Sequence, residues 1–340
     1  MLLSVAGLAL GLAAAELVLQ VAGVEVRAGR LTRDAVLGWR NRPGWKGPVF
    51  SINSHGCLGP EFPLEKPAGT VRILCLGDSC TAGDFLPSFD DTYPRQLDRG
   101  LREKLPRKRF EVINAGVGGY SSFQGRVWLE RDLLRGQPDL GILYFGWNDH
   151  WPARLGGPDK AVSDSWGERL RASLAWCKLL QLAIRAYHEV RGRELLPSDE
   201  AGAPAVHTAG RPPRVSQEDY ADNLRAMIRA VRERGGETIL VTAPDYLEVA
   251  EKDELPIPGG LAGGAAGVEA LVRLHAGYNA IARRVAREEG AGLVDLAAQF
   301  AGAPNPAKLF WKPPNDFIHL SREGYARLAR ALVETMTNGE

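Results

Sequence analysis

The 340-residue sequence has little net charge and few cysteines, and both shortages narrow the class of protein. Its 42 Lys and Arg residues nearly balance its 41 Asp and Glu residues, which leaves a formal net charge of +1. Such a balance gives no support for nucleic acid as a partner. The four cysteines, Cys57, Cys75, Cys80 and Cys177, form no C-x-x-C pair, so neither a zinc site nor a dense disulfide framework is indicated. We therefore expect no metal and no cofactor.

The rest of the composition is that of an ordinary globular protein. Hydrophobic residues make up 45% of the chain and charged residues 24%, which argues against a disordered chain. The length suits one large domain, or one domain with an insertion, and is enough to bury a substantial core.

Charge is also scarce at the N-terminus, where Glu16 is the one charged side chain in residues 1–24. About 20 apolar residues can cross a bilayer as a helix, so residues 1–26 are predicted to be a membrane anchor or a signal-like segment. A charge at the depth of Glu16 disfavours insertion, and the alternative is a buried or amphipathic helix. No Lys or Arg precedes the segment, whereas Arg27, Arg30 and Arg33 follow it. By the positive-inside rule this favours a cytoplasmic catalytic domain.

A lead-in segment over 27–70, rich in Gly, Pro and Arg, precedes a regular alternation of strands and helices. Short apolar runs predict strands at 71–77, 110–116, 138–146, 237–244 and 292–296. Apolar residues at helical spacing predict helices at 92–105, 122–134, 215–235, 268–290 and 321–336. This alternation predicts an α/β fold, a three-layer α/β/α sandwich around a parallel sheet. Residues 71–340 would form this domain, with an insertion at about 151–214 that breaks the alternation.

Polar or glycine-rich residues follow the first three predicted strands and precede the last helix. They are Gly77-Asp78-Ser79, Asn114 to Gly119, Gly146 to Asp149, and Asp316 to His319. In open α/β sheets ligands bind outside the carboxyl ends of the strands, so we expect these four segments to lie at one edge of the sheet.

These segments hold the residue types that nucleophilic catalysis at an ester needs. A serine hydroxyl needs a base, and the base needs an orienting group; Ser79, His319 and Asp316 suit these roles. The developing oxyanion needs donors already aimed at it, which the Ser79 and Gly119 backbone N–H groups and the Asn148 side-chain amide can supply.

Taken in order, the segments resemble the four blocks of the SGNH (GDSL-like) hydrolase family. The resemblance spans roughly 71–336 and implies a flavodoxin-like sheet. It also implies that Ser79, Gly119, Asn148 and His319 are the four residues that name the family, with Asp316 completing the triad. The segment INSHGCLGPE (52–61) is similar to one found in bacterial membrane-anchored members. That similarity implies a membrane-associated protein of the bacterial cell envelope with an extracytoplasmic catalytic domain, against the charge rule.

The sequence therefore predicts a serine esterase that forms an acyl-enzyme on a small-molecule, lipid or glycan ester. An O-acyltransferase that acetylates an envelope polysaccharide would use the same site, and a non-enzymatic glycan- or lipid-binding module would keep only its pocket. Trp147 and Trp151 either contact the substrate or belong to the core.

Overall fold

The computed structural model describes residues 2–23, 29–83, 85–153, 159–160, 177–191, 211–250, 264–314 and 316–338. The chain divides into two compact units. One consists of residues 1–42 and 161–202, and the other of residues 43–160 and 203–340. The boundaries predicted from the sequence for the lead-in, the hydrolase domain and its insertion stay predictions.

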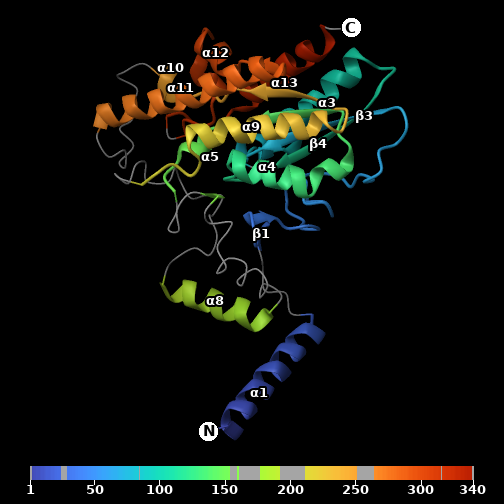
Figure 1. The fold of residues 1–340 in the computed structure, drawn as a ribbon, viewed down its shortest axis with the longest axis vertical. Coiled ribbons are helices and arrows are strands. Elements are labelled where there is room, and N and C mark those ends of the chain that lie inside the picture. The colour runs from blue at the N-terminus through green and yellow to red at the C-terminus, as the bar shows by residue number, and fades with distance from the viewer. Residues whose placement is uncertain are drawn as a thin grey trace. The chain divides into compact units, whose positions relative to one another are not determined.

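The larger unit is built on a five-stranded sheet (Figure 1). The strands are β3 (Thr70–Gly77), β4 (Arg109–Gly116), β5 (Leu140–Tyr144), β6 (Glu237–Val241) and β7 (Gly292–Val294). They lie in the order β4-β3-β5-β6-β7, and every neighbouring pair is parallel. Parallel sheets are covered on both faces, and accordingly every residue of β5 is buried. The strand order is the flavodoxin-like one.

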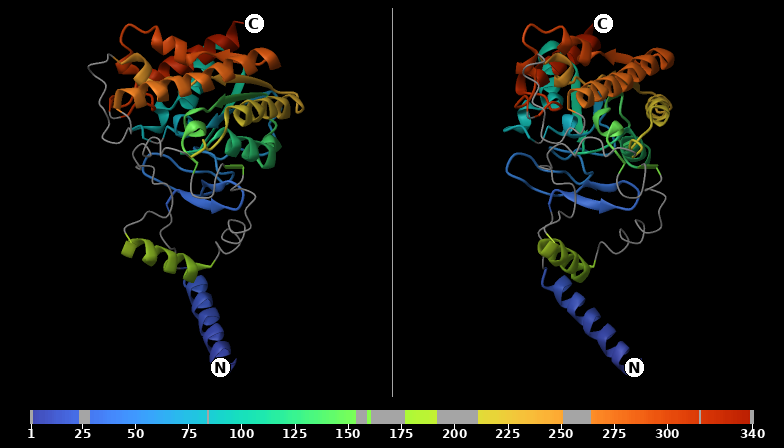
Figure 2. Two further views of the ribbon diagram at one scale, coloured as in Figure 1. Left: turned by 60° about the vertical axis from the view of Figure 1, so that its left-hand side comes forward. Right: turned by 90° about the vertical axis from the view of Figure 1, so that its left-hand side faces the viewer.

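Helices cover both faces of this sheet (Figures 1 and 2). α3 (Tyr93–Lys104) and α13 (Arg322–Thr337) pack against each other in one layer. α4 (Ser122–Arg131), α9 (Gln217–Arg232) and α11 (Gly264–Glu289) form the other. The predicted three-layer α/β/α sandwich is confirmed.

Short elements connect these layers. They are α2 (Ser79–Ala82), η1 (Phe89–Asp91), η2 (Leu133–Gly136), α5 (Trp147–His150), α10 (Tyr246–Val249), α12 (Leu296–Ala301) and η3 (Pro306–Leu309). Two of them, α2 and α5, begin just past the carboxyl ends of β3 and β5. All four cysteines are free thiols.

The smaller unit contains the predicted N-terminal segment. It has an antiparallel pair, β1 (Leu31–Asp34) with β2 (Gly38–Asn41), and two helices, α1 (Leu2–Val21) and α8 (Lys178–Arg191), that pack together. The Glu16 carboxylate accepts hydrogen bonds from the backbone N–H groups of Lys178 and Leu179, each at 2.9 Å. The one charge of the apolar segment therefore caps the N-terminus of α8.

In the described residues no helix has the length and apolar character that crossing a membrane requires. Anchoring of the chain through residues 1–26 stays a prediction.

Candidate active site

Three of the four predicted segments begin at the same level of the sheet. Gly77 at the end of β3 is the register partner of Gly116 on β4 and of Tyr144 on β5. Ser79 follows two residues after Gly77, Gly119 three after Gly116 and Asn148 four after Tyr144. The parallel register therefore brings all three to one edge, as the sequence predicts.

Ser79 opens the four-residue helix α2, whose N-cap is Asp78. Asp78 Oδ1 accepts a hydrogen bond from Cys80 N at 2.8 Å, which fixes the turn between strand and helix. The side-chain amide of Asn114 donates to the Thr81 carbonyl at 3.0 Å. Gly116 lets this helix approach the sheet, because a Cβ there would lie 2.1 Å from the backbone nitrogen of Ala82. These contacts hold the turn that carries Ser79 against the sheet.

His319 reaches Ser79 from the loop before α13, 240 residues later in the chain. Its Nε2 atom lies 2.8 Å from Ser79 Oγ, and its Nδ1 atom lies 2.7 Å from Asp316 Oδ2. Asp316 Oδ1 accepts the backbone N–H groups of Ile318 at 3.0 Å and His319 at 2.9 Å. The carboxylate therefore fixes both the loop and the imidazole.

The charge of Asp316 decides which imidazole nitrogen carries the proton. Burial acts to raise the pKa of Asp316, but the hydrogen bonds and the charge of His319 outweigh it, and the pKa is lowered. An ionised carboxylate only accepts hydrogen bonds, so Nδ1 of His319 carries its proton. Nε2 is then an acceptor, and the Ser79 hydroxyl donates to it.

Gly119 lies in a tight turn after β4. The Tyr120 N–H donates to the Val117 carbonyl at 3.1 Å, and Val117 N–H donates to the Gly77 carbonyl at 3.1 Å. The φ of Gly119 is +76°, the left-handed value that favours glycine. This turn therefore lies beside the end of β3, two residues before Ser79.

Asn148 lies in the first turn of α5, and its side-chain Nδ2 donates to Asp78 Oδ2 at 3.0 Å. Asp78 is buried, and burial raises its pKa. Asp78 thus caps α2 and orients the Asn148 amide. Sequence reasoning assigned Asp78 no role, and its place in the middle of the GDS block is the only signal for one.

Three N–H groups at this edge remain available. Across the described ranges, neither the Ser79 nor the Gly119 backbone N–H donates a hydrogen bond, and Asn148 uses one of its two amide hydrogens. These are the three groups predicted as oxyanion donors.

Trp147 and Trp151 lie in the hydrophobic core, with 1% and 4% of their surface exposed. Trp147 stacks on His275 at a ring-centroid distance of 4.0 Å and donates from Nε1 to the Pro244 carbonyl at 3.2 Å. Because both rings are buried, the structure favours the packing role over the substrate contact.

A different aromatic residue, missed from the sequence, lies beside His319. The half-buried Phe85 ring is 4.3 Å from the His319 ring, centroid to centroid, and 6.0 Å from the ring of the half-buried Trp311. No periodicity or motif marks Phe85, because its position depends on the loop after α2.

Metal-binding residue types were also compared across the described residues. In the part of the chain that the structure describes, no group of three or more His, Cys, Asp or Glu side chains is arranged to hold a metal ion. The expectation of no cofactor stays a prediction.

Comparison with known families identifies the family of this chain. The model of the GDSL-like Lipase/Acylhydrolase family matches residues 75–327, which include all four blocks. The chain belongs to this family. Its members hydrolyse ester bonds, and this family member is accordingly an ester-bond hydrolase.

Solved structures show a fold likeness to this GDSL-like protein. A lipase/acylhydrolase from Enterococcus faecalis is 17% identical with a TM-score of 0.49, covering 79% of this chain and 96% of its own. An acetylxylan esterase from Geobacillus stearothermophilus is 19% identical with a TM-score of 0.48, covering 78% and 94%. An alpha/beta hydrolase from the metagenome of Lake Arreo, Spain, is 19% identical with a TM-score of 0.45, over the same shares. No curated protein matches the chain.

Proposed function

We propose that this GDSL-like protein hydrolyses carboxylic esters through a covalent acyl-enzyme on Ser79. The observation that carries the proposal is the unbroken pair of contacts from Ser79 Oγ to His319 Nε2 and from His319 Nδ1 to Asp316 Oδ2, at 2.8 and 2.7 Å. A serine so paired has a base within hydrogen-bond reach, and that base is held in the required tautomer.

The reaction proceeds in two halves. Ser79 Oγ attacks the ester carbonyl carbon while its proton passes to His319 Nε2. The tetrahedral intermediate collapses, the bond to the alcohol oxygen breaks, and His319 returns the proton to the departing alcohol. Water then attacks the acyl carbon and loses one proton to His319 Nε2. The second tetrahedral intermediate collapses, the bond from the acyl carbon to Ser79 Oγ breaks, and His319 returns the proton to Oγ as the carboxylic acid leaves. Asp316 stays ionised throughout and stabilises the imidazolium.

The carbonyl oxygen becomes negative in both halves, and three donors at the strand ends support its stabilisation. They are the Ser79 and Gly119 backbone N–H groups and the second amide hydrogen of Asn148. Such donors act strongly because they are fixed in position before the charge develops. Asp78 fixes the Asn148 amide by accepting a 3.0 Å hydrogen bond from it.

The substrate we propose is a small ester of a lipid or a glycan, with its apolar part against Phe85. This ring lies on the imidazole of His319 and is half-buried, so one part of it is available to an acyl chain or a sugar ring. A complete triad supports an enzyme over a binding module. An O-acyltransferase would use the same acyl-enzyme, with a glycan hydroxyl in place of water.

A panel of nitrophenyl esters tests this proposal. Ser79→Ala and His319→Ala should each abolish turnover, whereas the matched controls Ser54→Ala and His55→Ala, away from the site, should retain it. Wild-type turnover in either of the first two variants would contradict the mechanism. Adding an acceptor glycan then separates the two reactions, because acyl transfer moves acetyl onto the glycan and hydrolysis releases it as acetate.

We also propose that α1 associates with a lipid bilayer of a cell envelope, with the catalytic unit outside the cytoplasm. Exposed large apolar side chains support the first part. In the described residues, seven large apolar side chains are exposed, and all but Val49 lie on α1. The six on α1 are Leu8, Leu10, Leu12, Leu17, Val18 and Val21. Flotation with phospholipid vesicles should carry the full chain, and Leu10→Glu with Leu17→Glu should abolish flotation. Recovery of the wild type in the unbound fraction would contradict the proposal.

A further inference from the structure

We infer that Arg214 is a positioning residue for the oxyanion hole, and that it acts by holding the turn that carries Gly119. The inference rests on the proposed function. Arg214 lies at the end of the predicted insertion, outside all four sequence blocks. Its side chain reaches Gly119, 95 residues earlier in the chain, and its Nη1 donates to the Gly119 carbonyl at 2.8 Å.

The guanidinium of Arg214 is held on several sides. Nε and Nη2 donate to the two carboxylate oxygens of Asp159 at 3.1 and 2.8 Å, and Nη2 also donates to Gln124 Oε1 at 2.7 Å. Only 4% of the residue is exposed. A buried charge is tolerated when it is paired and hydrogen-bonded, and a planar fork of five donors can serve three partners at once. The group therefore has one defined position.

The partners of Arg214 are tied to the same turn. Ser121, two residues after Gly119, donates from Oγ to Asp159 Oδ2 at 2.6 Å, and its N–H donates to Gln124 Oε1 at 3.1 Å. Ser121 and Gln124 form a capping box at the start of α4. The Gly119 turn is thus held at its carbonyl by Arg214 and at its exit by the cap.

The backbone of Arg214 is bonded to the other side of the oxyanion hole. Arg214 N–H donates to the Trp151 carbonyl at 2.8 Å, and Val215 N–H donates to the Asp149 carbonyl at 2.9 Å. Asp149 directly follows Asn148. Arg214 and the adjoining Val215 therefore connect the turn after β4 with the turn after β5, and so fix the Gly119 and Asn148 donors relative to each other.

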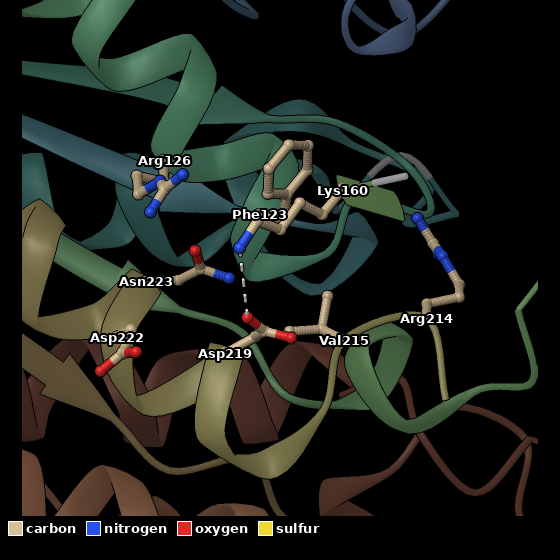
Figure 3. Close-up of a pocket in the computed structure, with 8 residues that line it drawn as sticks. All are labelled: Phe123, Arg126, Lys160, Arg214, Val215, Asp219, Asp222 and Asn223. Atoms are coloured by element: carbon tan, nitrogen blue, oxygen red, sulfur yellow. Dashed lines mark ion pairs between the residues drawn. The ribbon is translucent and has the colours of Figure 1, made fainter. Parts of the chain in front are cut away.

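A neighbouring cavity does not explain these contacts. Its volume is about 90 Å³, and it is lined by Arg214 together with residues of α4 and α9 and with Lys160. Figure 3 shows the Arg214 guanidinium turned away from Asp219 and Asp222 on α9, while Lys160 pairs with Asp219. Neither Ser79 nor His319 lines this cavity. The side chain of Arg214 is committed to the Gly119 turn instead.

The role of Arg214 predicts a specific kinetic defect. Gly119 supplies a donor that is used most in the transition state, and loss of one whole donor costs about 10²–10³ in kcat. A turn that is loosened but not lost should cost less. We expect Arg214→Lys to lower kcat about 10- to 100-fold with little change in KM, because its three donors sit on one nitrogen and cannot span the partners that three guanidinium nitrogens reach. The pH profile of kcat should keep its shape, because the Asp316–His319 pair is untouched.

Arg72 provides the matched control. It is 1% exposed, pairs with Glu111 and donates to the carbonyls of Pro63 and Leu64, away from the strand ends that carry the site. Arg72→Lys should lower the melting temperature as Arg214→Lys does, but leave kcat of the folded protein unchanged. A second variant, Asp159→Asn, removes the negative charge that pairs with Arg214, and should lower kcat in the same direction by a smaller factor.

The outcomes distinguish a failure of the role of Arg214 from a failure of the proposed function. Wild-type kcat in folded Arg214→Lys and Asp159→Asn would overturn the inference and leave the proposed function standing, provided that Ser79→Ala is inactive. Should Ser79→Ala keep its turnover, the proposed function itself fails. A lowered kcat in both variants, with slower labelling of Ser79 by a fluorophosphonate, would support the role of Arg214.

Discussion

Asp316→Asn is the substitution whose effect on the site can be worked out most fully. The carboxylate accepts three hydrogen bonds. Two of them, from the backbone N–H groups of Ile318 and His319, end on Oδ1, and an amide oxygen can accept both. The third, from His319 Nδ1 to Oδ2 at 2.7 Å, is lost, because the Asn amide nitrogen is a donor. The loop should therefore keep its conformation while the histidine changes.

With a donor opposite Nδ1, His319 is stable only when its proton sits on Nε2. Nε2 then cannot accept the Ser79 proton, and the enzyme has no base. The equivalent change in a serine protease triad lowers kcat by about 10⁴ through the same reversal of tautomer. We expect a fall of about 10³–10⁴ in kcat for a nitrophenyl ester, with little change in KM or in melting temperature.

Asp295→Asn is the control for this substitution. Asp295 pairs with Arg283 at 2.8 Å and caps α12. This ion pair is about as exposed as the Asp316–His319 pair, and weakening it should leave kcat unchanged. Steady-state kinetics give kcat and KM of both variants, and circular dichroism shows whether each variant is folded. A folded Asp316→Asn enzyme with kcat within tenfold of wild type would refute the tautomer argument.

Three further substitutions test other parts of the account. Asn148→Ala should lower kcat about 10²–10³-fold, the usual loss of one oxyanion donor; an unchanged rate would remove Asn148 from that role. Trp147→Ala should lower the free energy of unfolding in urea by about 3–5 kcal/mol, as for other buried aromatics, and a loss below about 1 kcal/mol would contradict its core position. Burial raises the pKa of Asp245 to about 8, far above its unfolded value, so the folded protein holds a proton that the unfolded chain releases and stability falls as pH rises toward 8. Asp245→Asn cannot ionise, so its melting temperature relative to that of the wild type should be higher at pH 8 than at pH 4. An equal difference at both pH values would argue against a buried neutral acid.

The sheet could be predicted from the sequence because parallel strands are buried on both faces and are therefore continuous apolar runs. The predicted strand 71–77 differs from β3 by one residue, and 110–116 differs from β4 by one. The predicted strand 138–146 is longer than β5, which ends at Tyr144. Gly146 turns the chain there with a φ of +144°, a conformation that an apolar run does not reveal.

The closeness of Ser79, His319 and Asp316 could also be predicted, since Asp316 and His319 are local neighbours and Ser79 follows a strand end. The direction in which a side chain points could not be predicted from the sequence. Trp147 is adjacent to Asn148 in sequence, yet its ring packs against His275 on α11, a contact set by how two distant elements meet. The contact between Arg214 and Gly119 has the same origin, because the path of the predicted insertion decides it and no local pattern encodes that path.

Covalent labelling of Ser79 tests the central claim most directly. The full chain is treated with a fluorophosphonate, digested, and mapped by mass spectrometry, with Ser79→Ala and heat-unfolded protein as controls. We expect one adduct, on Ser79, that is absent from both controls and forms at the same rate as esterase activity is lost. An adduct on another serine, or full inactivation with Ser79 unmodified, would contradict it.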